Sequence, residues 1–176
     1  TVVIQGLGNV GYHTAQFFRQ AGAKVIALAE YEGAIFNADG LNELDVFTHR
    51  QKTGSILNFP GATNLVKNTD ALEMQCDILI PAALESVIHK ENADRVKAKI
   101  IGEAANGPCT PDADEIFIKK GILCVPDMYL NAGGVTVSYF EWLKNLSHVR
   151  YGRMEKRFTE NLNGRIINEI EGLTGK

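Results

Sequence analysis

The chain has 176 residues, of which 45% are hydrophobic and 22% charged, a composition typical of a globular domain rather than a disordered segment. Its net charge of −3 gives no electrostatic reason to expect nucleic acid or an anionic membrane as a partner. No run of residues approaches the ~20 apolar positions of a membrane-spanning helix.

The first predicted strand, residues 1–5, leads directly into a glycine-rich turn. This turn, Gly6-Leu7-Gly8-Asn9-Val10-Gly11, has the spacing Gly-x-Gly-x-x-Gly and opens a predicted helix that stops at Gly22. The small or apolar residues on one face of that helix are Val10, Thr14, Phe17, Phe18 and Ala21. The next apolar run, residues 24–29, is followed by Glu30, about 20 residues past the turn. This order of elements predicts a site for the pyrophosphate of a dinucleotide.

The glycines and the acid have separate physical roles in such a site. Gly6 permits a tight turn, Gly8 leaves the backbone open to the pyrophosphate, and Gly11 lets the helix approach the strand. Unpaired N–H groups at the helix N-terminus favour an anion. Glu30 can accept hydrogen bonds from an adenosine ribose and would repel a 2′-phosphate, so we expect NAD, with NADP as the alternative. A glycine turn in some other α/β fold is the competing interpretation.

The remaining apolar runs alternate with helical patterns. Strands are predicted at 77–80, 99–102 and 121–126, and helices at 41–52 and 111–120. The helix at 111–120 has Thr110 as its predicted cap and Pro111 at its first position, which suits a helix start. Strands separated by helices predict a Rossmann-type doubly wound parallel sheet, which we assign to residues 1–150.

Residues 151–176 have a different pattern, a single apolar stripe in an otherwise polar segment. The stripe consists of Met154, Phe158, Leu162, Ile166, Ile170 and Leu173. Spacings of three and four residues predict a C-terminal amphipathic helical extension. We expect the surface that covers it to lie in sequence beyond this chain, so that the extension is truncated here. Residue 1 already lies within a predicted strand, and we likewise expect the chain to start inside a longer protein.

Small and amide side chains follow three neighbouring predicted strands. Ala82 and Ala83 follow the run at 77–80, Asn106 follows 99–102, and Asn131 follows 121–126. Ligands of doubly wound sheets bind at the carboxyl ends of the strands. Asparagine offers both a donor and an acceptor, as a carboxamide ligand requires. Each asparagine alone is explained as a turn residue, but two at neighbouring strand ends favour a ligand site.

The cysteines and histidines have no metal-ligand spacing, and we predict no metal. The four histidines are scattered, and the three cysteines form no Cys-x-x-Cys pair. We interpret the cysteines as small buried hydrophobic residues in a reducing compartment. They are Cys76, Cys109 and Cys124.

From residue 1 to about Arg153 the chain resembles the cofactor-binding domain of glutamate dehydrogenase, in the family of glutamate, leucine, phenylalanine and valine dehydrogenases. The resemblance rests on residues 5–11, 76–83, 96–101, 105–108 and 126–142. Ala105-Asn106-Gly107-Pro108 and Val137-Ser138-Tyr139-Phe140-Glu141-Trp142 are similar to glutamate-type members and differ from leucine-type members. Cys109 and Tyr31 depart from the usual family residues.

The resemblance assigns part of the cofactor to each loop. It implies that the pyrophosphate contacts Gly8, Asn9 and Val10, and that the adenosine ribose contacts Glu30. It implies further that the nicotinamide half lies along Ala82, Ala83 and Asn106, with its carboxamide hydrogen-bonded to Asn131. Together with Gly6 and Gly11, these residues form the expected cofactor site.

The resemblance also implies a reaction, the reversible oxidative deamination of L-glutamate to 2-oxoglutarate and ammonia, in which the cofactor carries the hydride. Val135 and Ser138 would line the amino-acid pocket, with the Ser138 hydroxyl near the substrate's side-chain carboxylate. The catalytic lysine and carboxylate of the family lie in an N-terminal substrate domain that has no match in this chain. We therefore assign no catalytic residue here, and expect the chain to bind dinucleotide without turnover.

Two classes of function remain open. One is a fragment of a glutamate dehydrogenase, and the other is a stand-alone NAD-binding module for sensing or assembly; a domain of a leucine- or phenylalanine-type amino-acid dehydrogenase is a further alternative. The amino-acid pocket residues favour the fragment, since a sensor needs no such pocket. The resemblance further implies a homo-hexameric parent enzyme in the cytoplasm, or in the mitochondrial matrix of a eukaryote, with no nucleic-acid or membrane partner.

Overall fold

The structure, a computed structural model, describes residues 1–146 together with residues 162, 164, 167 and 171. It divides into two units, Thr1–Ala132 and Gly133–Lys176, and each is described by itself. The predicted extension at 151–176 lies outside the described residues apart from four positions. Of its apolar stripe only Leu162 is described, and it is helical.

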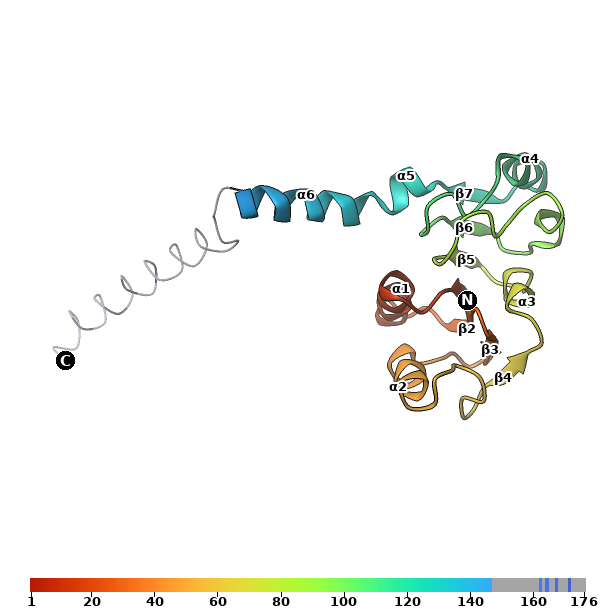
Figure 1. The fold of residues 1–176 in the computed structure, drawn as a ribbon, viewed down its shortest axis with the longest axis horizontal. Helices are drawn as coiled ribbons and strands as arrows, with labels where there is room; N and C mark the ends of the chain where they lie inside the picture. Colours follow the sequence, from red (N-terminus) through yellow and green to blue (C-terminus); the bar gives the residue numbers. More distant parts are fainter. Residues whose placement is uncertain (147–161, 163, 165–166, 168–170, 172–176) are drawn as a thin grey trace. The chain divides into compact units, whose positions relative to one another are not determined.

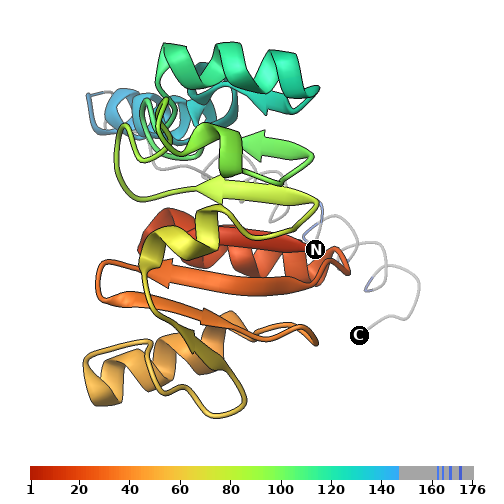
Figure 2. The ribbon, with the colours of Figure 1, turned by 90° about the vertical axis from the view of Figure 1, so that its right-hand side faces the viewer.

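The unit Thr1–Ala132 is built on a seven-stranded sheet with the order β4-β3-β2-β1-β5-β6-β7 (Figure 2). The strands are β1 (Val2–Gln5), β2 (Val25–Glu30), β3 (Gly33–Phe36), β4 (Thr63–Leu65), β5 (Ile78–Pro81), β6 (Ile100–Gly102) and β7 (Leu123–Val125). From β2 through β1, β5 and β6 to β7, every neighbouring pair is parallel. The predicted doubly wound parallel sheet is confirmed, and all five predicted strands belong to it.

The sequence did not predict β3 and β4, which extend the sheet beyond β2. Both ladders are antiparallel, and Glu30 of β2 pairs directly with Gly33 of β3. An antiparallel neighbour needs only a two-residue connection, here Tyr31 and Glu32. A four-residue strand reached by such a short turn has too little hydrophobic pattern to be recognised in advance.

Helices cover both faces of this sheet (Figure 1). The α-helices of the unit are α1 (Asn9–Gln20), α2 (Glu43–Thr53), α3 (Asn68–Leu72), α4 (Pro111–Lys120) and α5 (Asp127–Leu130), and Ala93–Arg95 form a 3-10 turn, η1. Figure 1 shows α1 and α2 on one side of the strands and α3 and α4 on the other. Each side has its own apolar core. Val2 and Ile4 of β1 contribute to the core beside α1 and α2, whereas Val3 contributes to the opposite core.

The face of α1 that packs against the sheet differs from the prediction. Val10 and Phe17 are 51% and 63% exposed, and the fully buried residues of the helix are Gly11 and Ala15. Phe18 of the predicted face does pack, partly buried, against the core beside α1 and α2. The prediction was wrong for Val10 and Phe17 because it followed residue size, whereas a helix lying close to a strand needs small residues at the contact. The predicted stop is confirmed, since Gly22 has φ +86° and donates from N–H to the Arg19 carbonyl at 3.0 Å.

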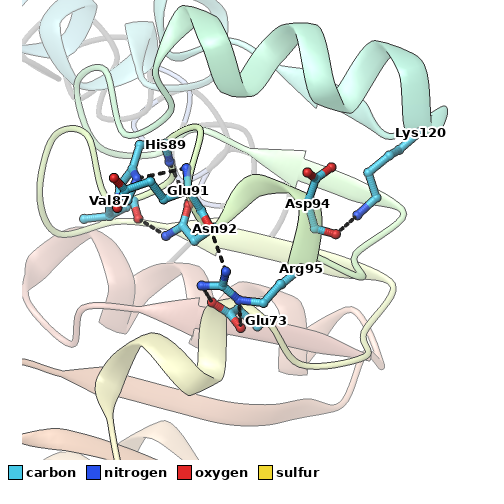
Figure 3. Close-up of polar contacts among 8 residues, drawn as sticks. All are labelled: Glu73, Val87, His89, Glu91, Asn92, Asp94, Arg95 and Lys120. Atoms are coloured by element: carbon cyan, nitrogen blue, oxygen red, sulfur yellow. Dashed lines mark hydrogen bonds and ion pairs between the residues drawn. The ribbon is translucent and has the colours of Figure 1, made fainter.

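The connection between β5 and β6 contains η1 and a polar network instead of a full helix (Figure 3). The guanidinium of Arg95 donates to both carboxylate oxygens of Glu73 at 2.7 Å and to the Glu91 carbonyl at 2.7 Å. Asn92 is buried; its Oδ1 accepts from His89 N at 2.8 Å, and its Nδ2 donates to the Val87 carbonyl at 2.9 Å. These hydrogen bonds take the place of the backbone hydrogen bonds that a helix would supply.

The start of α4 was predicted, whereas α6 was not. Thr110 stands at the cap of α4 with Pro111 first in the helix, as expected, but the Thr110 hydroxyl makes no capping bond and is buried without a partner among the described residues. The unit Gly133–Lys176 contains most of α6 (Ala132–Leu146), which the sequence did not predict as a helix. None of the helices in the described part of the chain has the length and apolar character needed to cross a bilayer.

Candidate functional site

The glycine turn joins the carboxyl end of β1 to α1. Gly6 follows the strand with φ +96°, and its N–H donates to the Ala29 carbonyl at 2.7 Å. A Cβ placed on Gly11 would lie 1.9 Å from the Gly6 carbonyl oxygen, a distance no side chain tolerates. The close approach predicted for Gly11 is therefore present, and it sets how near α1 comes to the strand.

The N-terminus of α1 is open. Gly8 holds the cap position without a side-chain bond, no acid lies in the first turn, and a Cβ at Gly8 would meet nothing within 4 Å. Asn9 and Val10 are exposed. The first N–H groups of a helix have no partner within the helix and carry partial positive charge. This end of α1 has the features of an anion-binding site.

The segment after β5 lies against this turn. A Cβ on Gly6 would lie 3.0 Å from the Ala82 carbonyl oxygen and 3.0 Å from the Ala83 Cβ. Ala82 N donates to the Gln5 carbonyl at 2.8 Å, and the N–H of Ala105 donates to the Pro81 carbonyl at 2.9 Å. The structure thus brings Ala82 and Ala83 beside Gly6, as their position at a strand end predicts.

Glu30 ends β2 and is held by two donors. Its Oε1 accepts from Leu7 N at 2.6 Å and from Arg50 Nη1 at 3.0 Å. Arg50, on α2, also donates to the Leu7 carbonyl at 3.3 Å, so it joins the glycine turn to the acid. Both of these donors contact Oε1 of the carboxylate. No motif in the sequence points to Arg50, because only the sheet order brings α2 to the end of β2.

The two predicted asparagines meet. Asn131 Nδ2 donates to Asn106 Oδ1 at 2.8 Å, although the residues come from loops after different strands. This hydrogen bond does not use the Asn106 Nδ2 donor or the Asn131 Oδ1 acceptor. These two groups match the hydrogen-bonding needs of a carboxamide.

Two acids outside the predicted site hold the asparagine loops. Glu103, after β6, is 7% exposed; its Oε1 accepts from Cys109 N at 3.2 Å and its Oε2 from Asp127 N at 3.0 Å. Asp127 in turn accepts from Gly107 N at 2.8 Å through Oδ2. These bonds connect the loop of Asn106 to α5, which immediately precedes Asn131. An acid directly after an apolar strand is the signal that could have identified Glu103.

Cys76 is a buried core residue as predicted, and Cys109 and Cys124 are partly buried and pack against the same hydrophobic core. Cys76 is 3% exposed, and burial, followed by the nearby Asp77 carboxylate, raises the pKa of its thiol to about 11. Cys109 and Cys124 are half-buried, and their sulfurs lie within 4.8 Å of each other and of a Glu103 carboxylate oxygen. A hydrogen bond with Cys124, burial and the Glu103 charge all raise the pKa of the Cys109 thiol.

The residues expected to line an amino-acid pocket belong to the other unit. Val135 and Ser138 both lie on α6, three residues apart and hence on the same side of that helix. Within the helix, the Ser138 hydroxyl donates to the Gly134 carbonyl at 3.1 Å. Their role in a pocket stays a prediction.

Known proteins match the whole chain. It is 56% identical over 176 residues to the mitochondrial glutamate dehydrogenase of Dictyostelium discoideum, covering 100% of this chain and 35% of that protein. It is 49% identical over 177 residues to a probable glutamate dehydrogenase of Sinorhizobium fredii, covering 100% of this chain and 40% of that protein. The chain therefore spans only 35–40% of the length of these relatives.

Solved structures share the fold. The hetero-hexameric glutamate dehydrogenase of Thermus thermophilus, in a leucine-bound form, superposes with a TM-score of 0.78 at 29% identity, over 95% of this chain and 38% of that one. The glutamate dehydrogenase of Peptoniphilus asaccharolyticus gives 0.65 at 34% identity, over 84% and 33%. The sequence profile of one family matches residues 1–172. The chain belongs to the glutamate/leucine/phenylalanine/valine dehydrogenase family, oxidoreductases of amino-acid metabolism.

Proposed function

We propose that the chain is the dinucleotide-binding domain of a glutamate dehydrogenase and that it binds NAD at the carboxyl ends of the parallel strands. The observation that carries this proposal is the open, uncapped N-terminus of α1 in the same sheet edge as the Asn106–Asn131 pair. The pyrophosphate would contact Gly8, Asn9 and Val10 on α1. An anion there gains the helix dipole and unpaired N–H groups.

The other parts of the cofactor follow the same edge of the sheet. Ala82 and Ala83 would flank the nicotinamide half because their small side chains leave the backbone accessible. The donor of Asn106 and the acceptor of Asn131 would bind the carboxamide and so fix which face of the ring is presented. The cofactor, when bound, supplies the hydride chemistry. The chain's own residues bind and orient it.

Glu30 would select NAD over NADP. Its Oε2 would accept from the ribose hydroxyls, and a 2′-phosphate would meet a second negative charge there. Arg50 lies against the same carboxylate and offsets part of that repulsion. We therefore propose a preference for NAD, with NADP as the weaker ligand.

The complete reaction belongs to a longer protein. We propose that it is the oxidative deamination of L-glutamate to 2-oxoglutarate and ammonia in a homo-hexameric enzyme of the cytoplasm or mitochondrial matrix. The two relatives named as glutamate dehydrogenases and the glutamate-type residues Val135 and Ser138 support this assignment. With the substrate domain of the family unmatched here, this chain by itself would bind dinucleotide without turnover, with no catalytic residue of its own.

Substitution of Gly8 tests the binding proposal. Gly8 has φ −80° and space for a Cβ, so Gly8→Ala should leave the fold intact while its methyl group obstructs the pyrophosphate. We expect calorimetric titration with NAD to show affinity reduced by about tenfold or more, roughly 1.4 kcal/mol.

Gly133→Ala is the matched control, because a Cβ there also meets nothing within 4 Å but the residue lies on α6. Its affinity should equal that of the unchanged chain. Undiminished NAD binding by Gly8→Ala would rule out the turn as the pyrophosphate site. Titration with NADP beside NAD tests Glu30, and equal affinities would show that this acid does not select.

A further inference from the structure

Three ligand atoms of metal-binding type converge beside the sheet end. They are a carboxylate oxygen of Glu103 and the sulfurs of Cys109 and Cys124, all within 4.8 Å of one another. The backbone enforces this meeting. Cys124 pairs in register with Ile101, two residues before Glu103, and the Cys109 N–H donates to the Glu103 carboxylate at 3.2 Å. Strand pairing and loop closure therefore bring these three residues together.

The Glu103 carboxylate of the cluster has no cationic side chain paired with it among the described residues. The ion pairs among the described residues join other acids to Arg, Lys or the N-terminus, and none includes Glu103. The two N–H donors to Glu103 occupy only part of a carboxylate's roughly four acceptor positions. Two thiolates here would repel the Glu103 carboxylate, which lies within 4.8 Å of both sulfurs. A bound dication would replace the thiol protons and remove the repulsion.

The ligand types select the ion. Sulfur ligands favour zinc over magnesium and calcium, which take oxygen ligands. Tetrahedral zinc with Zn–S distances of about 2.3 Å places two sulfurs roughly 4 Å apart, within the span of the cluster. Both thiols are half-buried, so an ion can reach them.

We propose that Glu103, Cys109 and Cys124 form a zinc-binding site with two thiolates, one carboxylate oxygen and a water as the fourth ligand. Each zinc ion bound releases the two thiol protons to solvent, and no electron is transferred. This site is separate from the anion site at α1 and does not rest on the proposed dinucleotide function. The sequence shows no metal-ligand motif here, because fourteen residues separate the two cysteines and the third ligand is an acid.

Cobalt titration of the reduced 176-residue chain tests the proposal, since Co²⁺ is a coloured substitute for zinc. We expect one equivalent to bind with a thiolate-to-cobalt charge-transfer band, and added Zn²⁺ to displace it. Cys109→Ser and Cys124→Ser should each weaken binding by more than about 100-fold, the upper end for loss of an outer-shell partner. Cys76→Ser is the control, because Cys76 is buried outside the cluster, and it should leave binding unchanged.

Several results would overturn the site. These are the absence of a charge-transfer band at one equivalent, retention of the band in both serine variants of the cluster, or its loss in Cys76→Ser alone. A Cys109–Cys124 disulfide in air would also count against zinc if the reduced chain then bound no cobalt. Thermal unfolding of each variant shows whether it is folded, and Cys109→Ser and Cys124→Ser give independent readings of the same site.

Discussion

At the scale of single residues, the glycines of the turn differ in what they contribute. Gly8 leaves open space, whereas Gly11 fills a position where a Cβ would lie 1.9 Å from a backbone oxygen. The Gly6 backbone cannot move aside as a flexible side chain can, so packing requires glycine at position 11. The fold therefore needs glycine at Gly11 and at Gly6, where φ is +96°, whereas the openness of Gly8 suits a ligand.

Gly11→Ala should destabilise the chain. The methyl group must push α1 away from β1, and overpacking of this kind lowers the free energy of unfolding by about 1–3 kcal/mol or more. Urea unfolding followed by circular dichroism measures the loss. Gly8→Ala, which meets no atoms within 4 Å, is the control and should change stability far less. Equal stability of the two variants would show that the helix moves without strain.

Glu43 makes the free energy of unfolding depend on pH in the acid range. It is 1% exposed, and both of its oxygens accept from Arg19, at 2.7 and 2.9 Å. The bond from Arg19 holds the pKa of the Glu43 carboxyl below its ordinary value. A group with a lowered folded-state pKa stabilises the chain above its unfolded-state pKa, and that stabilisation is lost as pH falls through the folded-state pKa.

Glu43→Gln should therefore flatten the fall in unfolding free energy between neutral pH and pH of about 3, below the ordinary glutamate pKa. Chemical denaturation at a series of pH values measures the slope. Asp45→Asn removes an exposed acid from the same first turn of α2 and should keep most of the slope. An unchanged slope in Glu43→Gln would show that other acids cause the acid sensitivity.

At the scale of elements, the β5–β6 connection shows which polar contacts stabilise a segment without regular structure. Asn92 is buried and bonds the backbone of Val87 and His89 within its loop, whereas the Arg95–Glu73 pair is more exposed, with side chains 58% and 25% exposed (Figure 3). A buried donor or acceptor left without a partner costs more than an exposed ion pair contributes. The asparagine, not the charge pair, should hold this connection.

Asn92→Ala should lower the free energy of unfolding by about 1–3 kcal/mol, because His89 N and the Val87 carbonyl lose their partner. Arg95→Ala should have a smaller effect, which high salt diminishes further. Urea denaturation of both variants at low and high salt compares them. A larger loss of unfolding free energy in Arg95→Ala would mean that the Arg95–Glu73 ion pair, and not the Asn92 side chain, stabilises the loop.

At the scale of the whole molecule, the sheet collects residues that are far apart in the chain. Asn106 and Asn131, Glu30 and Arg50, and Glu103 with Cys109 and Cys124 each meet only through strand order and loop closure. Parallel neighbours place their carboxyl ends along one edge, so each loop adds groups to the same region. This explains why their strand-end positions indicated that the two asparagines lie close together, while the acids and thiols around them were missed.

The sequence by itself determined the five parallel strands, the place of the glycine turn and the strand ends where side chains gather, because apolar runs, glycine spacing and helix stops are local patterns. It did not determine which face of α1 is buried, the antiparallel β3 and β4, the clamp of Arg50 on Glu30, or the Glu103–Cys109–Cys124 cluster. Only the tertiary structure decided these. Each depends on how closely two backbones approach or on which strands become neighbours, and the periodicity of one segment contains no information about another.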